Sequence, residues 1–178
     1  MIKSSPNTLL QYYDSYFTVS ELKKLYQRYT KLSVNGDGVD LDSFCSQPEV
    51  SGCKLIILAF ETLCPFRKEE PASQTKMNFE VFVLLLSKFS PRSPVNEKTQ
   101  FLYLCLTDHG QRPFDRDVYI TLMRDLYDGF VPAPVVDESS SVMWERLIKN
   151  SKRKTLSERA FANLFAQLDI LNVCTIVM

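Results

Sequence analysis

The sequence predicts an all-α protein, and three observations support this fold class. Thr18 and Glu21 form a capping box, and apolar side chains then recur at helical spacing over residues 22–32. The apolar stretch at 54–62 indicates a second helix. The Ser-Pro-Arg-Ser-Pro sequence at 90–94 breaks the chain between two halves. We therefore expect helices connected by loops, divided between two halves of the chain.

The composition limits the class of protein. A chain of 178 residues with 45% hydrophobic content can bury a core. Its 21 Lys and Arg balance its 21 Asp and Glu, so no overall field attracts nucleic acid. Ile2 stands where an N-myristoyl signal needs glycine, and the apolar runs at 55–60 and 81–86 are too short to cross a membrane. We expect a soluble protein without a direct membrane anchor.

The cysteines indicate the compartment. They are five in number and include no C-x-x-C pair. This usage is typical of reduced thiols in the cytoplasm or nucleus, and it argues against a zinc site. We expect a cytoplasmic or nuclear location, with membrane association only through a partner.

The first half contains elements for two helix-loop-helix units. After the first helix, the sequence Asn35-Gly36-Asp37-Gly38 predicts a tight turn. Residues 39–45 are expected to begin the helix that leaves this first unit. The helix at 54–62 enters the second unit. Its connection at 63–76 contains two prolines and five charges, so we expect a surface loop there.

The second half repeats this organisation. Residues 101–106 and 117–127 are expected to enter and leave a third unit, and residues 143–149 and 158–168 a fourth. The stretch 129–141 is rich in proline and serine, so we expect a loop there.

One segment carries a family resemblance. The sequence Met-Asn-Phe-Glu-Val-Phe-Val-Leu-Leu-Leu-Ser-Lys-Phe-Ser at 77–90, followed by Glu-Lys-Thr-Gln-Phe at 97–101, resembles the middle of the calcineurin B-like EF-hand proteins. This family includes calcineurin B, its homologous proteins and the calcium- and integrin-binding proteins. The resemblance implies four EF-hands in two lobes, 1–90 and 97–178, joined by a linker at 91–96. It also implies short β-pairings between loops, through Val39, Met77, Phe114 and Leu156.

The resemblance places residues at the calcium-ligand positions, and most of them are poor ligands. A working EF-hand needs oxygen ligands at positions 1, 3 and 5, glycine at 6 and a bidentate glutamate at 12. Hand one has Ser33, Asn35, Asp37, Gly38 and Ser43 at these positions, hand three has Thr107, His109, Gln111, Arg112 and Val118, and hand four has Lys149, Ser151, Arg153, Lys154 and Ala160. In hand two, Val81 stands where glutamate is needed. We expect no calcium site and no cofactor, with Asn35 and Asp37 as a weak candidate pair only.

The apolar content of the helices exceeds what two small lobes need. In the family that the chain resembles, such surplus lines a groove that takes an amphipathic helix from a partner. The expected groove residues are Leu84, Leu85, Phe89, Phe101, Leu104, Leu122, Met123, Leu126, Leu164, Phe165 and Leu168. The apolar C-terminal tail, with Val173, Ile176, Val177 and Met178, is expected to cover this groove.

These expectations together predict a non-catalytic, calcium-independent adaptor or regulatory subunit. His109 is the single histidine and lies in a loop, and the chain has no phosphate-binding or H-E-x-x-H motif, so we expect no enzyme. The partner helix is expected to belong to a phosphatase-like subunit, the cytoplasmic tail of a membrane protein or a scaffold. Two alternatives remain open. One is a calcium sensor that keeps a weak site in hand one, and the other is a nucleic-acid-associated factor that uses the basic hand-four loop.

Overall fold

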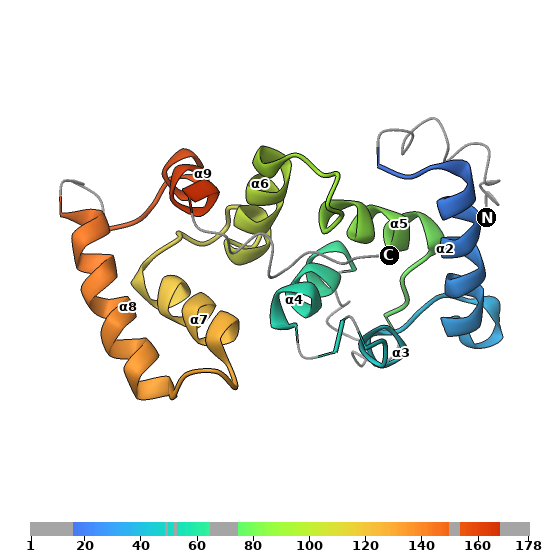
Figure 1. The fold of residues 1–178 in the computed structure, drawn as a ribbon, viewed down its shortest axis with the longest axis horizontal. Helices are drawn as coiled ribbons and strands as arrows, with labels where there is room; N and C mark the ends of the chain where they lie inside the picture. The colour runs from blue at the N-terminus through green and yellow to red at the C-terminus, as the bar shows by residue number, and fades with distance from the viewer. Residues whose placement is uncertain (1–15, 49, 52, 65–74, 150–153, 168–178) are drawn as a thin grey trace.

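The computed structural model describes residues 16–48, 50–51, 53–64, 75–149 and 154–167, and these form an all-α fold. The described helices are α2 (Val19–Leu32), the 3-10 helix η1 (Val34–Gly36), α3 (Leu41–Cys45), α4 (Lys54–Leu63), α5 (Phe79–Lys88), α6 (Val95–Leu106), α7 (Arg116–Tyr127), α8 (Ala133–Ile148) and α9 (Glu158–Gln167). They form an elongated array, with α2 at one end, α8 at the other and α4, α5 and α6 between them (Figure 1). The predicted all-α class is confirmed.

The first helix begins as predicted, at the capping box of Thr18 and Glu21. The Thr18 backbone N–H donates to the Glu21 carboxylate at 2.7 Å, and the Glu21 backbone N–H donates to the Thr18 hydroxyl at 3.3 Å. Each bond satisfies a backbone donor that the helix start leaves without a partner.

Four later helices begin in one repeated way. A side chain accepts a hydrogen bond from the backbone N–H three residues on in every case: Asp40 from Ser43 (2.8 Å), Asn78 from Val81 (2.9 Å), Asp115 from Val118 (3.1 Å) and Ser157 from Ala160 (3.3 Å). Such caps stabilise a helix start by about 1 kcal/mol each. The helices that follow them are α3, α5, α7 and α9.

The residue before each of these caps belongs to an antiparallel bridge between two loops. Val39 bridges to Met77 through two backbone hydrogen bonds of 3.0 and 2.8 Å, and Phe114 bridges to Leu156, whose N–H donates to the Phe114 carbonyl at 2.9 Å. Val39, Met77 and Phe114 are fully buried and Leu156 nearly so. These are the four residues that were expected to pair.

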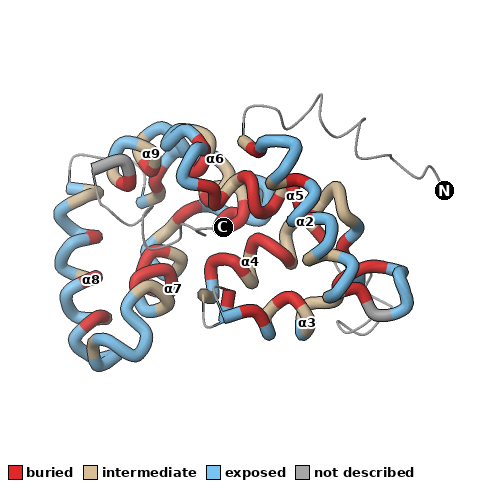
Figure 2. Tube along the Cα trace, turned by 45° about the vertical axis from the view of Figure 1, so that its right-hand side comes forward, coloured by how far each residue is buried: buried red, intermediate tan, exposed pale blue. Residues whose placement is uncertain are grey.

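Aromatic side chains fill the core around both bridges. Phe82 packs edge-on against Phe44 and Tyr29, with ring centroids 6.1 and 5.7 Å apart. Around the Phe114–Leu156 bridge, the ring centroid of Phe161 lies 5.1 Å from that of Phe114 and 4.2 Å from that of Phe165. The tube drawing shows α4 and α5 as mostly buried or intermediate, whereas α8 is mostly exposed with short buried stretches (Figure 2).

Two predicted boundaries in the second half were wrong. The stretch 129–141 is not wholly a loop, because α8 begins at Ala133. Proline is tolerated in the first turn of a helix, where its missing N–H has no intrahelical partner, so Pro134 does not prevent this start. The helix is held by Val136, Ser140 and Trp144, which recur every four residues and are buried. In addition, α6 begins at Val95, six residues before the predicted 101 and inside the expected linker 91–96.

Helix α4 connects the two halves by packing on α6 and α7, while α5 packs on α6. Its Lys54 ammonium pairs with Asp125 at 3.1 Å and with Asp128 at 2.9 Å. Within the residues described, no helix has the length and apolarity that a membrane span needs.

Candidate functional site

The expected groove residues separate into two sets in the structure. Five are buried in the core: Leu85, Phe89, Leu122, Met123 and Phe165. Five are half-buried: Leu84, Phe101, Leu104, Leu126 and Leu164. Leu168 and the tail residues Val173, Ile176, Val177 and Met178 lie outside the described residues. The half-buried set is the more exposed of the two, yet none of its members lines either of the two pockets described below.

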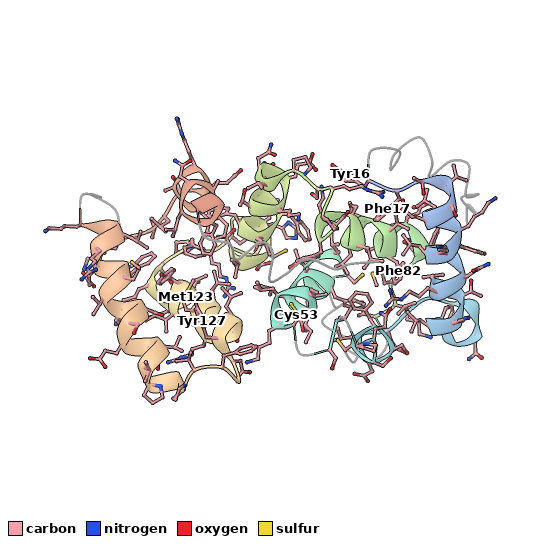
Figure 3. The ribbon with its side chains drawn as sticks, viewed as in Figure 1. Tyr16, Phe17, Cys53, Phe82, Met123 and Tyr127 are labelled. Carbon is pink, nitrogen blue, oxygen red and sulfur yellow. The ribbon has the colours of Figure 1, made fainter. Side chains whose placement is uncertain are left out.

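An apolar pocket lies instead between α7 and α8. Its volume is about 270 Å³, and it is lined by Tyr119, Met123, Tyr127, Val131, Val135, Val136, Ser139, Ser140 and Met143. The α7 side chains Tyr119, Met123 and Tyr127 recur every four residues and therefore share one face of the helix. The labelled Met123 and Tyr127 lie on the side of α7 that faces α8 (Figure 3). Met123 is the member that belonged to the expected groove.

Large apolar side chains stand exposed around this pocket. Val135, Met143 and Tyr127 are 52%, 47% and 46% exposed, and Phe130 in the α7–α8 turn is 85% exposed. Apolar surface gathered in this way usually marks an interaction site. The sequence reasoning missed it because 129–141 was expected to be a loop. The valine spacing of a helix, with Val135 and Val142 two turns apart, was the signal that could have revealed it.

Polar contacts hold the opposite edge of the α7–α8 pair. The Arg124 guanidinium makes a bidentate contact with Asp137 at 2.5 and 2.6 Å, and Arg116 donates to the Ser141 hydroxyl at 2.8 Å. Behind the pocket, Trp144 packs on Tyr119 with ring centroids 5.5 Å apart. The helices are therefore fixed along one edge, and the pocket opens along the other.

A second pocket, of about 350 Å³, lies between α4 and α7 and has a charged lining. Apolar side chains such as Ile57 and Leu122 share it with Lys54, Glu61, Arg112, Asp117 and Asp125. Because Lys54 already pairs with Asp125, part of this lining serves to join the two halves. We regard this pocket as a poorer site for an apolar anchor.

A lysine from the second loop pairs with a carboxylate of the first loop. The Lys76 ammonium pairs with the Asp37 carboxylate, and this hydrogen bond lowers the pKa of Asp37. The backbone N–H of Gly38 donates to the Ser33 hydroxyl at 3.0 Å. Asn35, the other weak candidate ligand, has a left-handed backbone with φ of 62°. A lysine therefore neutralises the carboxylate of the weak candidate pair, Asn35 and Asp37.

The third loop is closed by Arg112. Its guanidinium Nε donates to the Leu106 carbonyl at 2.9 Å, and its backbone N–H donates to the Thr107 carbonyl at 3.0 Å. Asp108 and His109 have left-handed φ angles of 49° and 54°, and both side chains are exposed. Among the described parts of the chain, no three His, Cys, Asp or Glu residues lie close enough together to hold a metal ion. In the fourth loop, Ser151 and Arg153 lie outside those parts.

The buried thiols are poor nucleophiles. Burial raises the pKa of Cys64 and of Cys105 to about 11, so both are protonated near neutral pH. Cys45 and Cys53 are partly exposed, and neither forms a disulfide with another described residue. None of these sulfur atoms lies in either pocket lining.

The chain was also compared with known proteins. No model of a protein family matches it, and no curated protein matches it.

Proposed function

We propose that this chain is a degenerate EF-hand protein of the calcineurin B-like type, with two lobes joined at residues 91–94, before α6 begins at Val95. In this proposal it acts as a non-catalytic adaptor or regulatory subunit that binds an amphipathic helix of a partner protein without calcium. The partner helix belongs to a phosphatase-like subunit, to the cytoplasmic tail of a membrane protein or to a scaffold.

The fourfold repeat at the loop ends is the observation that carries the proposal. Each unit has a buried bridging residue, then a capping residue, then a helix. In an EF-hand, short β-pairing of this kind joins two loops, and the bidentate glutamate stands three residues after the cap. Ser43, Val81, Val118 and Ala160 occupy that position here. None of the four has a carboxylate, so the repeat keeps its structural residues without its strongest calcium ligand.

The charges in the loops support calcium independence. Lys76 pairs with Asp37 in the first loop, and Arg112 donates to the helix end in the third. Lys149 and Lys154 flank the fourth and are exposed. A cation next to a ligand oxygen competes with a metal ion for it, because like charges repel. Apolar burial around the bridges then stabilises the paired loops in place of metal.

The helix-binding role rests on the exposed apolar surface between α7 and α8. At about 270 Å³ the pocket is smaller than most small-molecule sites, which span about 300–1,000 Å³. Its size suits an apolar side chain that anchors a protein segment. An enzyme is disfavoured, since the apolar lining contains no acid, base or nucleophile beyond two serines and a tyrosine pair.

Two parallel measurements test this proposal. Isothermal titration of the full chain with calcium is expected to give no heat of binding at micromolar concentrations. Affinity purification from the native cell, with calcium and with chelator, is expected to yield the same stoichiometric partner in both samples. A micromolar calcium site, or a partner gained only with calcium, would instead establish the sensor with Asn35 and Asp37 as ligands.

A further inference from the structure

One surface of α8 is exposed, apolar and edged by carboxylates. Val135, Val142 and Met143 are 52%, 50% and 47% exposed, and with Ser139 they follow one stripe along the helix. The stripe borders the α7–α8 pocket, because Val135, Ser139 and Met143 also line it. From here on, the name α8 stripe covers these four α8 residues together with the adjoining α7–α8 pocket.

The carboxylates of Glu138 and Glu145 lie along the outer edge of the α8 stripe. The two residues are seven apart, so they lie two turns apart on nearly the same side of the helix. Both are exposed, and within the described residues neither makes a hydrogen bond or ion pair. Asp137, which directly precedes Glu138, is not available in this way because its carboxylate already pairs with Arg124. The outer edge therefore has two carboxylates available to a partner.

We propose that the α8 stripe binds a basic amphipathic helix, and this inference rests on the proposed adaptor function. An apolar side chain of the partner fills the pocket between Met123 and Met143. Two Lys or Arg residues of the partner, seven apart, meet Glu138 and Glu145 along the outer edge. Arg146 is exposed at the end of the stripe and repels a cation there, so the partner's basic residues lie on the glutamate edge alone.

A synthetic helical peptide of about 18 residues, or five turns, provides the probe. One version has leucines at i, i+4 and i+7 with two lysines seven apart on one flank. The matched version has glutamates in place of the lysines. Trp144 is the only tryptophan of the chain and packs on Tyr119 of the pocket, so its fluorescence reports binding at this site without a label.

The lysine peptide is expected to shift the Trp144 emission and to bind more tightly than the glutamate peptide. Val135→Ser and Met143→Ser are each expected to weaken binding by about tenfold, as loss of an interface anchor does. Glu138→Gln with Glu145→Gln is expected to weaken binding of the lysine peptide by about threefold and to remove the preference between peptides. These side chains are exposed, so the variants keep the fold, which circular dichroism verifies.

Matched controls separate the α8 stripe from the rest of the surface. Val19→Ser replaces a valine that is 49% exposed on α2, and Glu158→Gln neutralises an exposed carboxylate on α9. Neither variant is expected to change peptide affinity.

Four results would overturn the inference. Equal affinity for both peptides would refute the charged edge. Binding that persists in Val135→Ser and Met143→Ser but is lost in Leu84→Ser would move the site to the expected groove, and the adaptor function would stand. A homodimer seen by sedimentation and lost in Val135→Ser would make a second copy the occupant. If neither peptide binds anywhere, the adaptor function loses its support as well.

Discussion

Lys76 pairs its ammonium with the carboxylate of Asp37 across two loops that are 39 residues apart in the sequence. The pair lies next to the Val39–Met77 bridge, and Asp37 stands at a position that supplies a calcium ligand in a working EF-hand loop. The Lys76 ammonium thus supplies a positive charge beside the Asp37 carboxylate.

Replacing Lys76 tests this role. In Lys76→Met the pKa of Asp37 is expected to rise toward its ordinary value, because the hydrogen bond that lowers it is lost. Carboxyl titration by NMR measures the change. The loop is still expected to take up no calcium, since Ser43 supplies no bidentate carboxylate. Micromolar calcium binding by the variant would show that Lys76 alone had blocked a competent site.

Gly38 is expected to tolerate no side chain. Its φ of +129° is unfavourable for other residues, and a Cβ would lie 2.8 Å from the Lys76 Cβ and 3.1 Å from the Met77 carbonyl. Gly38→Ala should therefore cost about 1–3 kcal/mol for the backbone alone, with the clash added. Gly36→Ala is the matched control, because φ is +73° and nothing lies within 4 Å of its Cβ. Urea unfolding of both variants decides the point, and equal losses would refute the close approach.

Phe114 is expected to be among the most costly residues to truncate. It is fully buried, forms the second bridge and packs on Phe161. Phe114→Ala should lower the free energy of unfolding by about 3–5 kcal/mol, through lost burial and a cavity. Phe130→Ala, at a residue 85% exposed, should change it by less than about 0.5 kcal/mol. Denaturant titrations followed by Trp144 fluorescence compare the two, and similar losses would contradict the assigned burial.

Glu21 is expected to make stability depend on acid pH. Its hydrogen bonds with Arg92 and Thr18 lower its pKa to about 2, from an ordinary value of 4.5. A pKa lowered by folding stabilises the protein above the unfolded value, so this contribution is lost as the pH falls from about 4.5 toward 2. In Glu21→Gln the slope of urea midpoint against pH should be shallower across that window. An unchanged slope would show that other carboxylates dominate acid unfolding.

The start of the first helix was predictable from sequence because its determinants are local. The capping box of Thr18 and Glu21 spans four residues, and the observed hydrogen bonds match it. The four bridging residues were expected from the family resemblance rather than from a local pattern, and the observed bridges pair Val39 with Met77 and Phe114 with Leu156. The beginning of α8 was missed because its prolines were given more weight than the four-residue spacing of Val136, Ser140 and Trp144. The α8 helix is stabilised because its Trp144 packs on Tyr119 and Phe114, and those two residues lie far from it in the sequence.

The candidate site was less predictable. Leucines and phenylalanines at helical spacing identify an apolar face, but the sequence does not show which of them are buried in the core and which remain at the surface. Met123 proved to be buried next to the pocket, while Phe130 and Val135 stand exposed beside it. The sequence by itself determined the all-α class and the capping box of Thr18 and Glu21, because each depends on neighbours a few positions apart. Only the tertiary structure decided the α7–α8 pocket, the Lys76–Asp37 pair and the carboxylate-edged α8 stripe, because these depend on which distant side chains packing brings together and which it leaves at the surface.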